Sequence, residues 1–196
     1  MADDGAPSRI PTELADTHAA LVAHLLEHSV KRGDFVLKSG KPTDWFLDSK
    51  QTACRADGIQ LVATLALALL PDDIDSIGGL TAGADPVGFG VAAVAATRGH
   101  PLRSFSIRKE AKDHGVTGRL AGALQAGDRV AVVEDTVTRG SSPLEAARVV
   151  RELGAQPVVI MPIVDRGGTC AEMAAAEGID FIPLVTAPEL GFDFEG

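Results

Sequence analysis

The chain has 196 residues, of which 45% are hydrophobic and 23% charged, so it is expected to form one globular domain and wholesale disorder is excluded. Eighteen basic residues against 27 acidic ones give a formal net charge of -9, which disfavours general binding to nucleic acids or anionic membranes. Two cysteines, Cys54 and Cys170, are too few for a disulfide framework, and we expect a cytoplasmic protein.

Polar residues 1–11 are expected to form a flexible tail. Apolar spacing then predicts a helix over Thr12–Val30, ended by Gly33, and two short strands at 35–37 and 45–47 joined by a turn or loop. Helices and strands alternate beyond this point. The predicted helices cover 55–70, 86–97, 143–153 and 169–177, and the predicted strands cover 76–79, 102–107, 129–134, 157–164 and 179–184. This alternation predicts an α/β fold with a parallel sheet.

Basic residues gather in two short stretches of this acidic chain. Residues 31–55 hold six Lys and Arg against three acidic residues, and residues 98–119 hold six against two. Two thirds of the cations therefore lie in these windows, while the rest of the chain carries a charge of -16. Such clustering indicates either a local anion site or two solvated surface stretches, and charge alone leaves both open.

An apolar strand from Val130 leads into two carboxylates, Glu134 and Asp135, and then into a loop rich in threonine, glycine and serine. Ser142 is predicted to cap the following helix, with a proline at its first position and a glutamate completing a capping box. Free N–H groups at a helix start bind anions, so the loop is predicted to hold a phosphate.

The two carboxylates restrict what this phosphate can belong to. Glu134 and Asp135 would repel a phosphate alone, so the ligand should also offer hydroxyl groups, a bound Mg²⁺, or both. A sugar phosphate meets this requirement. The alternative is an ordinary strand-loop-helix connection with acidic residues at the strand end.

The strand, the Glu-Asp pair and the Thr-x-Thr-x-Gly loop resemble the signature with which type I phosphoribosyltransferases bind 5-phosphoribosyl-1-diphosphate (PRPP). The resemblance implies a mainly parallel central sheet flanked by helices, with a small N-terminal hood at about 12–54 and a core at about 55–196. It also implies that Glu134 and Asp135 face the ribose hydroxyls. The residues that would hold the 5-phosphate are Thr136, Val137, Thr138, Arg139, Gly140, Ser141 and Ser142.

A second segment, Arg-Lys-Glu-x-Lys-x-His-Gly at 108–115, is similar to the charged loop of orotate phosphoribosyltransferases. Its composition fits a mobile flap over 108–119 or a solvated surface loop. The resemblance implies the flap, which would reach the neighbouring subunit's site in a homodimer. Its implied PRPP contacts are Arg108, Lys109, Lys112 and His114, and its implied catalytic residues are Lys109, Lys112 and His114, together with Asp135.

Two further segments resemble the same family. Residues 35–41 and 45–50 look like its N-terminal hood, and Arg166 lies where the family places an arginine on the orotate carboxylate. The resemblance implies that Lys38 binds both PRPP and orotate. The full implied orotate set is Lys38, Phe46, Thr138 and Arg166.

The resemblance implies transfer of the phosphoribosyl group from PRPP to orotate, which gives orotidine 5′-monophosphate and diphosphate for pyrimidine biosynthesis. Mg²⁺ would be held mainly through PRPP, with no dedicated protein ligands, and neither nucleic acid nor membrane is expected as a partner. Thr81–Gly83 departs from the family, because several members have a diphosphate-binding lysine there. Arg139 stands where many relatives have a small residue.

Three alternatives are weighed against this interpretation. A purine phosphoribosyltransferase is disfavoured by Arg166 and Lys38, which a neutral base does not need. A non-catalytic RNA-binding regulator should expose a broad basic face, whereas here the cations are confined to two windows. Zinc could bind His24 and His28, but no acidic ligand pattern adjoins them, so we expect a solvated helix face.

Overall fold

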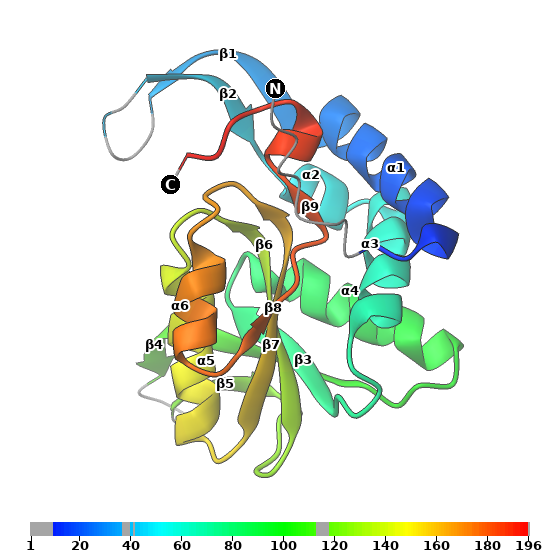
Figure 1. Ribbon diagram of the computed structural model, residues 1–196. Coiled ribbons are helices and arrows are strands. Elements are labelled where there is room, and N and C mark those ends of the chain that lie inside the picture. Colours follow the sequence, from blue (N-terminus) through cyan, green and yellow to red (C-terminus); the bar gives the residue numbers. More distant parts are fainter. Residues whose placement is uncertain (1–9, 37–39, 41, 113–117, 196) are drawn as a thin grey trace.

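The computed structural model describes residues 10–36, 40, 42–112 and 118–195, and Figure 1 shows how they are arranged. Its helices are α1 (Ala15–His24), α2 (Lys50–Ala53), α3 (Ala56–Leu69), α4 (Ala84–Thr97), α5 (Ser141–Glu152) and α6 (Cys170–Ala176). Its strands are β1 (Val30–Val36), β2 (Pro42–Leu47), β3 (Ser76–Leu80), β4 (Arg103–Lys112), β5 (Gly118–Gly122), β6 (Arg129–Val137), β7 (Gln156–Asp165), β8 (Asp180–Phe181) and β9 (Val185–Thr186). Among these residues, no helix is both long and apolar enough to cross a membrane.

The central sheet has the strand order β5-β4-β3-β6-β7-β8, with β9 also paired to β7. All these pairings are parallel except that of β5 with β4. The predicted parallel α/β sheet is therefore confirmed. The chain leaves β3 toward β4 on one side and continues through β6 toward β7 on the other, so the winding reverses between β3 and β6. Ligands bind at such a point, beyond the carboxyl ends of the strands.

Two apolar cores cover the two faces of this sheet, because successive side chains of a strand point to opposite faces. On β6, Ala131 and Val133 join a core with α1, α3 and α4, whereas Val130 and Val132 join a second core with α5 and α6. Figure 1 shows the two groups of helices on opposite sides of the sheet. Burial on both faces explains why β6 reads as a continuous apolar run rather than an alternating one.

The antiparallel pair β1–β2 projects beyond the carboxyl ends of the central strands (Figure 1). We call this pair the hood. Trp45 of β2 stacks on Phe192 from the last residues of the chain, with 4.0 Å between ring centroids and 3° between ring planes. The hood is therefore fixed to the core partly through the C-terminal segment.

The predicted first helix is present but ends differently. A 3-10 turn at 12–14, α1 and a π-helical turn at 25–29 together cover Thr12–Ser29, and β1 starts at Val30. Gly33 does not end the helix as predicted, because it lies inside β1, where the register with β2 shifts between Arg32 and Phe35. Pairing with β2 decides this boundary, and local sequence does not show it.

Two other strand predictions needed correction. β4 runs to Lys112 instead of ending at Ile107, and the unpredicted β5 pairs with it, so the charged segment begins as a β-hairpin. The expected strand at 179–184 is instead two short strands, β8 and β9, because Pro183 lies between them and cannot donate a ladder hydrogen bond.

Candidate active site

Two buried carboxyl groups lie next to each other near the end of β6. Glu134 is 6% exposed and Asp135 is 8% exposed. Burial, and then the hydrogen bond and negative charge of Asp135, raise the pKa of Glu134 to about 8. Burial lowers the pKa of Lys50, but its ion pair with Asp135 raises it above the ordinary value overall. The acidic pair is therefore short of positive charge and of hydrogen-bond donors, and a ligand with hydroxyl groups can supply the donors.

The loop after β3 approaches this pair closely. A Cβ added at Gly83 would lie 2.0 Å from Glu134 Oε1 and 2.6 Å from Asp135 Oδ1, so any larger residue there would displace the two carboxyl groups. Thr81 donates a hydrogen bond to Asp85 of α4, and Ser106 Oγ donates to the other oxygen of Asp85 at 2.5 Å. The two loops on either side of the winding reversal thus meet at one place, as the topology requires.

The loop between β6 and α5 is the segment predicted to hold a phosphate, and its helix cap differs from the prediction. Gly140, with φ of 79°, is the N-cap residue, and α5 begins at Ser141. Ser142 is therefore inside the helix and does not cap it, and Glu145 pairs with Arg119 instead of completing a capping box. An added Cβ at Gly140 would lie 2.8 Å from Cys170 Sγ, so both space and backbone angle require glycine. No side chain of the described residues caps α5, which leaves its first N–H groups available to an anion.

A cleft of about 930 Å³ lies between this loop and the hood. One wall is the loop and the start of α5, and the opposite wall comes from β1 and β2. Its lining residues are Lys31, Phe35, Val36, Phe46, Thr136, Val137, Thr138, Arg139, Gly140, Ser141, Ser142, Pro143, Arg166 and Glu195. The cleft therefore brings together every predicted 5-phosphate residue with three of the four predicted orotate residues.

Arg166 is a buried cation that lines this cleft. Its guanidinium carbon lies 4.2 Å from the centroid of the Trp45 ring, and its Nη2 donates to Glu195 Oε2 at 2.7 Å. Its backbone N–H donates to the Val137 carbonyl at 2.7 Å, and Asp165 Oδ1 accepts from the next two N–H groups, which holds the turn after β7. The guanidinium is thus positioned to bind a planar carboxylate.

No protein-family model matches the chain. Orotate phosphoribosyltransferase from Streptomyces avermitilis is 39% identical over 180 residues, which are 91% of this chain and 99% of that protein. The Corynebacterium glutamicum (strain ATCC 13032) enzyme of the same name is 37% identical, with 91% of this chain and 96% of that protein covered. The chain belongs to the orotate phosphoribosyltransferase family.

Solved structures of this family have the same fold. Mycobacterium tuberculosis orotate phosphoribosyltransferase in complex with Fe(III) dicitrate gives a TM-score of 0.81 at 34% identity, and covers 90% of this chain and 99% of that one. The same enzyme in complex with PRPP gives 0.77 at 31% identity, with the same coverage. The predicted phosphoribosyltransferase fold is thus confirmed, and the chain is a phosphoribosyltransferase.

The flap of this orotate phosphoribosyltransferase does not line the cleft within one chain, so far as its residues are described. Arg108 Nη1 donates to the Leu120 carbonyl at 3.4 Å across the β4–β5 hairpin, and Arg119 Nε donates to the Arg108 carbonyl at 2.6 Å. Lys109 is exposed. His114 and Lys38 lie outside the described residues, and only the backbone of Lys112 is described, at the end of β4. The structure therefore does not place these predicted flap and hood contacts.

Two residues of the orotate phosphoribosyltransferase site are absent from the predicted set. Lys50 is the ion-pair partner of Asp135, and its neighbour Ser49 Oγ lies 2.6 Å from Thr136 Oγ1. The segment 45–50 resembles the family hood, but nothing in its spacing indicates contact with β6. Glu195 reaches Arg166 from the C-terminal segment, and no sequence pattern identifies it.

Proposed function

We propose that this chain transfers the 5-phosphoribosyl group of PRPP to orotate, giving orotidine 5′-monophosphate and diphosphate in pyrimidine biosynthesis. The observation that carries the proposal is that Arg166 and the N-terminus of α5 line the same cleft of about 930 Å³. A phosphate and a planar carboxylate can therefore be bound together, at opposite ends of one substrate pair. A neutral purine offers no carboxylate that the guanidinium of Arg166 could bind.

In this proposal the PRPP end lies at the loop and the acidic pair. The N–H groups at the start of α5 and the hydroxyls of Thr136, Thr138, Ser141 and Ser142 hold the 5-phosphate. Glu134 and Asp135 accept hydrogen bonds from the ribose hydroxyls, and these donors relieve the repulsion within the pair. Lys50 and the ribose both bind Asp135, and the ion pair with Lys50 balances part of the negative charge of the acidic pair.

The orotate end is proposed to lie under the hood. Arg166 donates two parallel hydrogen bonds to the orotate carboxylate, a geometry that a guanidinium provides and an ammonium does not. Phe46 and Thr138 line the same cleft and contact the base in this proposal. The family resemblance adds Lys38, which would contact both substrates.

Catalysis in this site is mainly positioning and electrostatic stabilisation. Positive charge develops on the ribose ring as the bond to diphosphate breaks, and the buried carboxylates of β6 stabilise that charge. Lys109, Lys112, Arg108 and His114 neutralise the departing diphosphate as the flap closes and excludes water. Residues 81–83 lack the lysine of several relatives, and the backbone N–H groups of Ala82 and Gly83 take its place, since the Thr81 N–H donates to the Ile107 carbonyl.

Mg²⁺ fits the acidic pair. The donors there are carboxylate and hydroxyl oxygens from Glu134, Asp135 and Thr136, which are the ligand type that Mg²⁺ prefers. The raised pKa of Glu134 also indicates too little positive charge at this place. We propose that PRPP oxygens hold most of the ion, with the two carboxylates beside it. When bound, Mg²⁺ supplies Lewis-acid stabilisation of the leaving diphosphate.

We also propose a homodimer in which flap 108–119 reaches the partner's cleft. The support is that the described flap residues, Arg108 and Lys109 among them, do not line the cleft of their own chain. We further propose that the enzyme acts in the cytoplasm, because its two cysteines, Cys54 and Cys170, are free thiols, and thiols stay reduced there.

The experiment that tests the function follows orotate absorbance after PRPP and Mg²⁺ are added to the purified chain. Orotate should be consumed only when PRPP is present, and orotidine 5′-monophosphate should form in equal amount. Adenine, hypoxanthine and uracil serve as control bases and should not react. Folded protein that consumes a control base but not orotate would overturn the proposed substrate.

A further inference from the structure

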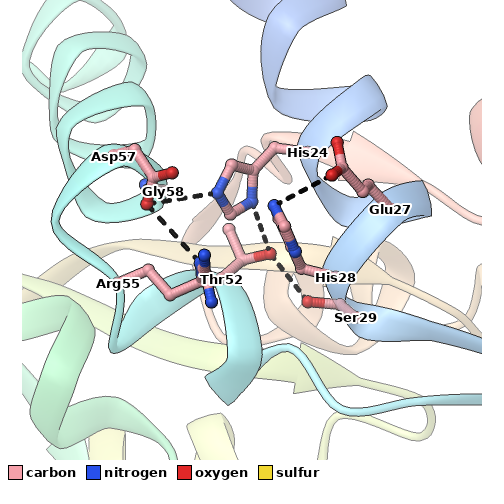
Figure 2. A network of polar contacts seen from close by, with 8 residues as sticks. All are labelled: His24, Glu27, His28, Ser29, Thr52, Arg55, Asp57 and Gly58. Atoms are coloured by element: carbon pink, nitrogen blue, oxygen red, sulfur yellow. Dashed lines mark hydrogen bonds and ion pairs between the residues drawn. The ribbon is translucent and has the colours of Figure 1, made fainter.

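Three potential metal ligands meet on the side of the molecule where α1 packs on α3. His24 is the last residue of α1, His28 lies in the π-helical turn that follows, and Asp57 is in the first turn of α3. Figure 2 shows the three side chains directed toward one another. One ligand atom from each residue lies within 4.8 Å of the other two. None of the three lines the substrate cleft, so the cluster is separate from the proposed active site.

The expectation of a solvated helix face is wrong for His24, because its side chain is only 9% exposed. Its Nδ1 lies 3.1 Å from Thr52 Oγ1, and Thr52 Oγ1 lies 2.7 Å from Ser29 Oγ. Either atom of each pair can be the donor, so one arrangement has Nδ1–H donating to Thr52 and Thr52 donating to Ser29. A hydroxyl chain of this kind orients a metal-binding imidazole.

The other ring nitrogen of His24, Nε2, is buried and has no hydrogen-bond partner, and it points at Asp57 Oδ1 across 3.5 Å. When Nδ1 donates to Thr52, Nε2 carries a lone pair, which is unfavourable next to a carboxylate. Two arrangements avoid this: a hydrogen on Nε2, as when Thr52 donates to Nδ1, or a metal ion bound to both groups.

His28 favours the metal ion. Its ring centroid lies 4.4 Å from that of His24, with the planes tilted by 58°, so a second imidazole adjoins the buried nitrogen. A single proton between His24 and Asp57 makes no use of His28, whereas a metal ion binds all three groups. Two imidazoles and one carboxylate are a donor set that suits zinc and similar divalent transition metals.

We propose that His24, His28 and Asp57 bind one divalent transition-metal ion, with zinc the best match. The fourth position is open to water or to Glu27, whose Oε1 lies 3.7 Å from His28 Nε2 (Figure 2). Since α1 precedes the hood and α3 belongs to the core, the ion joins these two parts of the chain.

The surroundings of Asp57 are compatible with this role. Arg55 Nε lies 3.6 Å from Asp57 Oδ1, but both side chains are about half exposed or more, so this ion pair is weak and the metal ion replaces it. Gly58 donates its backbone N–H to the same oxygen at 3.1 Å and orients the carboxylate. A Cβ at Gly58 would lie 2.2 Å from the Thr52 carbonyl oxygen and 2.8 Å from His24 Cε1, so glycine is required first by the Thr52 backbone and also leaves room for the imidazole.

The test is zinc titration of the full chain after dialysis against a chelator, with excess Mg²⁺ to occupy oxygen-only sites. We expect one zinc ion per chain by calorimetry, a higher melting temperature with zinc, and a tetrahedral visible spectrum when Co²⁺ is used. His28→Ala and Asp57→Asn should each weaken zinc binding by at least about 10-fold, since even a residue that only orients a ligand contributes that much. His100→Ala, which removes an exposed histidine outside the cluster, should leave binding unchanged.

Two results would overturn the metal site. One is equal zinc affinity in the wild-type, His28→Ala and His100→Ala proteins. The other is a wild-type melting temperature that responds to pH but not to zinc, which would show that His24 and Asp57 share only a proton. Circular dichroism of each metal-free variant shows whether it is folded. If His28→Ala is not folded, Asp57→Asn, which changes an exposed side chain, replaces it in the comparison.

Discussion

Glu195 accepts a hydrogen bond from the guanidinium of Arg166 at 2.7 Å, and the ring of Trp45 covers one face of the same guanidinium. Both charged side chains are largely buried, at 8% and 14% exposure. In the proposed function Arg166 binds the orotate carboxylate. The carboxylate of Glu195 therefore occupies the partner position that the substrate needs, and the two compete for one guanidinium.

This competition predicts the effect of Glu195→Gln. The neutral amide binds Arg166 more weakly, so the KM for orotate should fall about fivefold, which corresponds to roughly 1 kcal/mol. Turnover at saturating orotate and the KM for PRPP should stay the same. Asp193→Asn removes a nearby exposed charge and is the matched control. An orotate KM that is equal in the two variants would contradict the competition.

Arg166→Gln should have the opposite effect on orotate binding. Loss of a charge-assisted pair with a carboxylate costs about 3 kcal/mol, so kcat/KM for orotate should fall by about 100-fold. The KM for PRPP should change little, because Arg166 lies at the other end of the cleft. Steady-state kinetics with each substrate varied in turn separate the two effects. Arg148→Gln, at an exposed arginine on α5, controls for loss of one positive charge.

The flap and the ribose site can each be tested by a single change. Lys112→Ala should lower turnover by about 100-fold or more without unfolding the protein, a size typical of losing one transition-state charge contact.

Asp135→Asn should raise the KM for PRPP, because a ribose hydroxyl loses its charged acceptor. Unchanged turnover in the first variant, or normal PRPP kinetics in the second, would count against the assigned roles.

Mixing these two variants tests the proposed dimer. If the flap acts on the partner's cleft, a mixed dimer contains one site with an intact Lys112 flap and an intact Asp135. Random exchange makes half of the dimers mixed, so at a PRPP concentration well below the KM of Asp135→Asn the activity should recover to about a quarter of the wild-type value. If the flap acts within its own chain, mixed dimers contain no intact site and activity should stay at the level of the separate variants.

The buried carboxyl group of Asp128 makes the folding stability of the protein depend on pH in the acid range. Burial raises its pKa, but hydrogen bonds from Ser76 Oγ at 2.5 Å and from the Gln125 N–H at 2.9 Å, with the ion pair to Arg103, bring it below the ordinary value. A carboxyl pKa that is lower in the folded state stabilises the protein above the unfolded pKa of about 4. That contribution is lost as pH falls through the folded value.

Asp128→Asn should therefore lower the free energy of unfolding by about 2 kcal/mol at neutral pH, because a buried charged acceptor is replaced. The difference from wild type should begin to shrink as pH falls below about 4, where the unfolded chain takes up the proton, and should vanish only below the lowered pKa of folded Asp128. Urea unfolding at the two pH values measures both effects. Asp72→Asn, on an exposed side chain, is the control, and a difference that stays constant with pH would contradict the prediction.

The sequence predicts the parallel sheet and the phosphate loop, because both depend on local patterns. The apolar run of β6, the two carboxylates and the glycine at 140 are contiguous, so one segment of chain carries the signal. Contacts that join distant segments are different. Lys50 meets Asp135 across 85 residues, and Asp57 meets His24 only because α3 packs on α1. Neither contact has a periodicity or spacing that a sequence could show.

The predictions of helix and strand ends fail for a related reason. Gly33 is typical of a helix end, yet pairing between β1 and β2 includes it in a strand. Ser142 is a good N-cap by type, but Gly140, with its left-handed backbone, is the N-cap, so α5 starts two residues earlier than predicted. In both cases tertiary contacts select among boundaries that local preferences leave nearly equal in energy.

The contact between Trp45 and Phe192 has a consequence for synthesis of the chain. The hood is made early on the ribosome, whereas its aromatic partner belongs to the last residues, and the hydrogen bond from Thr43 to Glu195 spans 152 positions. A nascent chain must therefore carry a Trp45 without its stacking partner until Phe192 has left the ribosome. Full assembly of the substrate cleft waits for this late segment, and ribosome-stalled chains that lack residues 187–196 should expose the tryptophan to solvent quenchers.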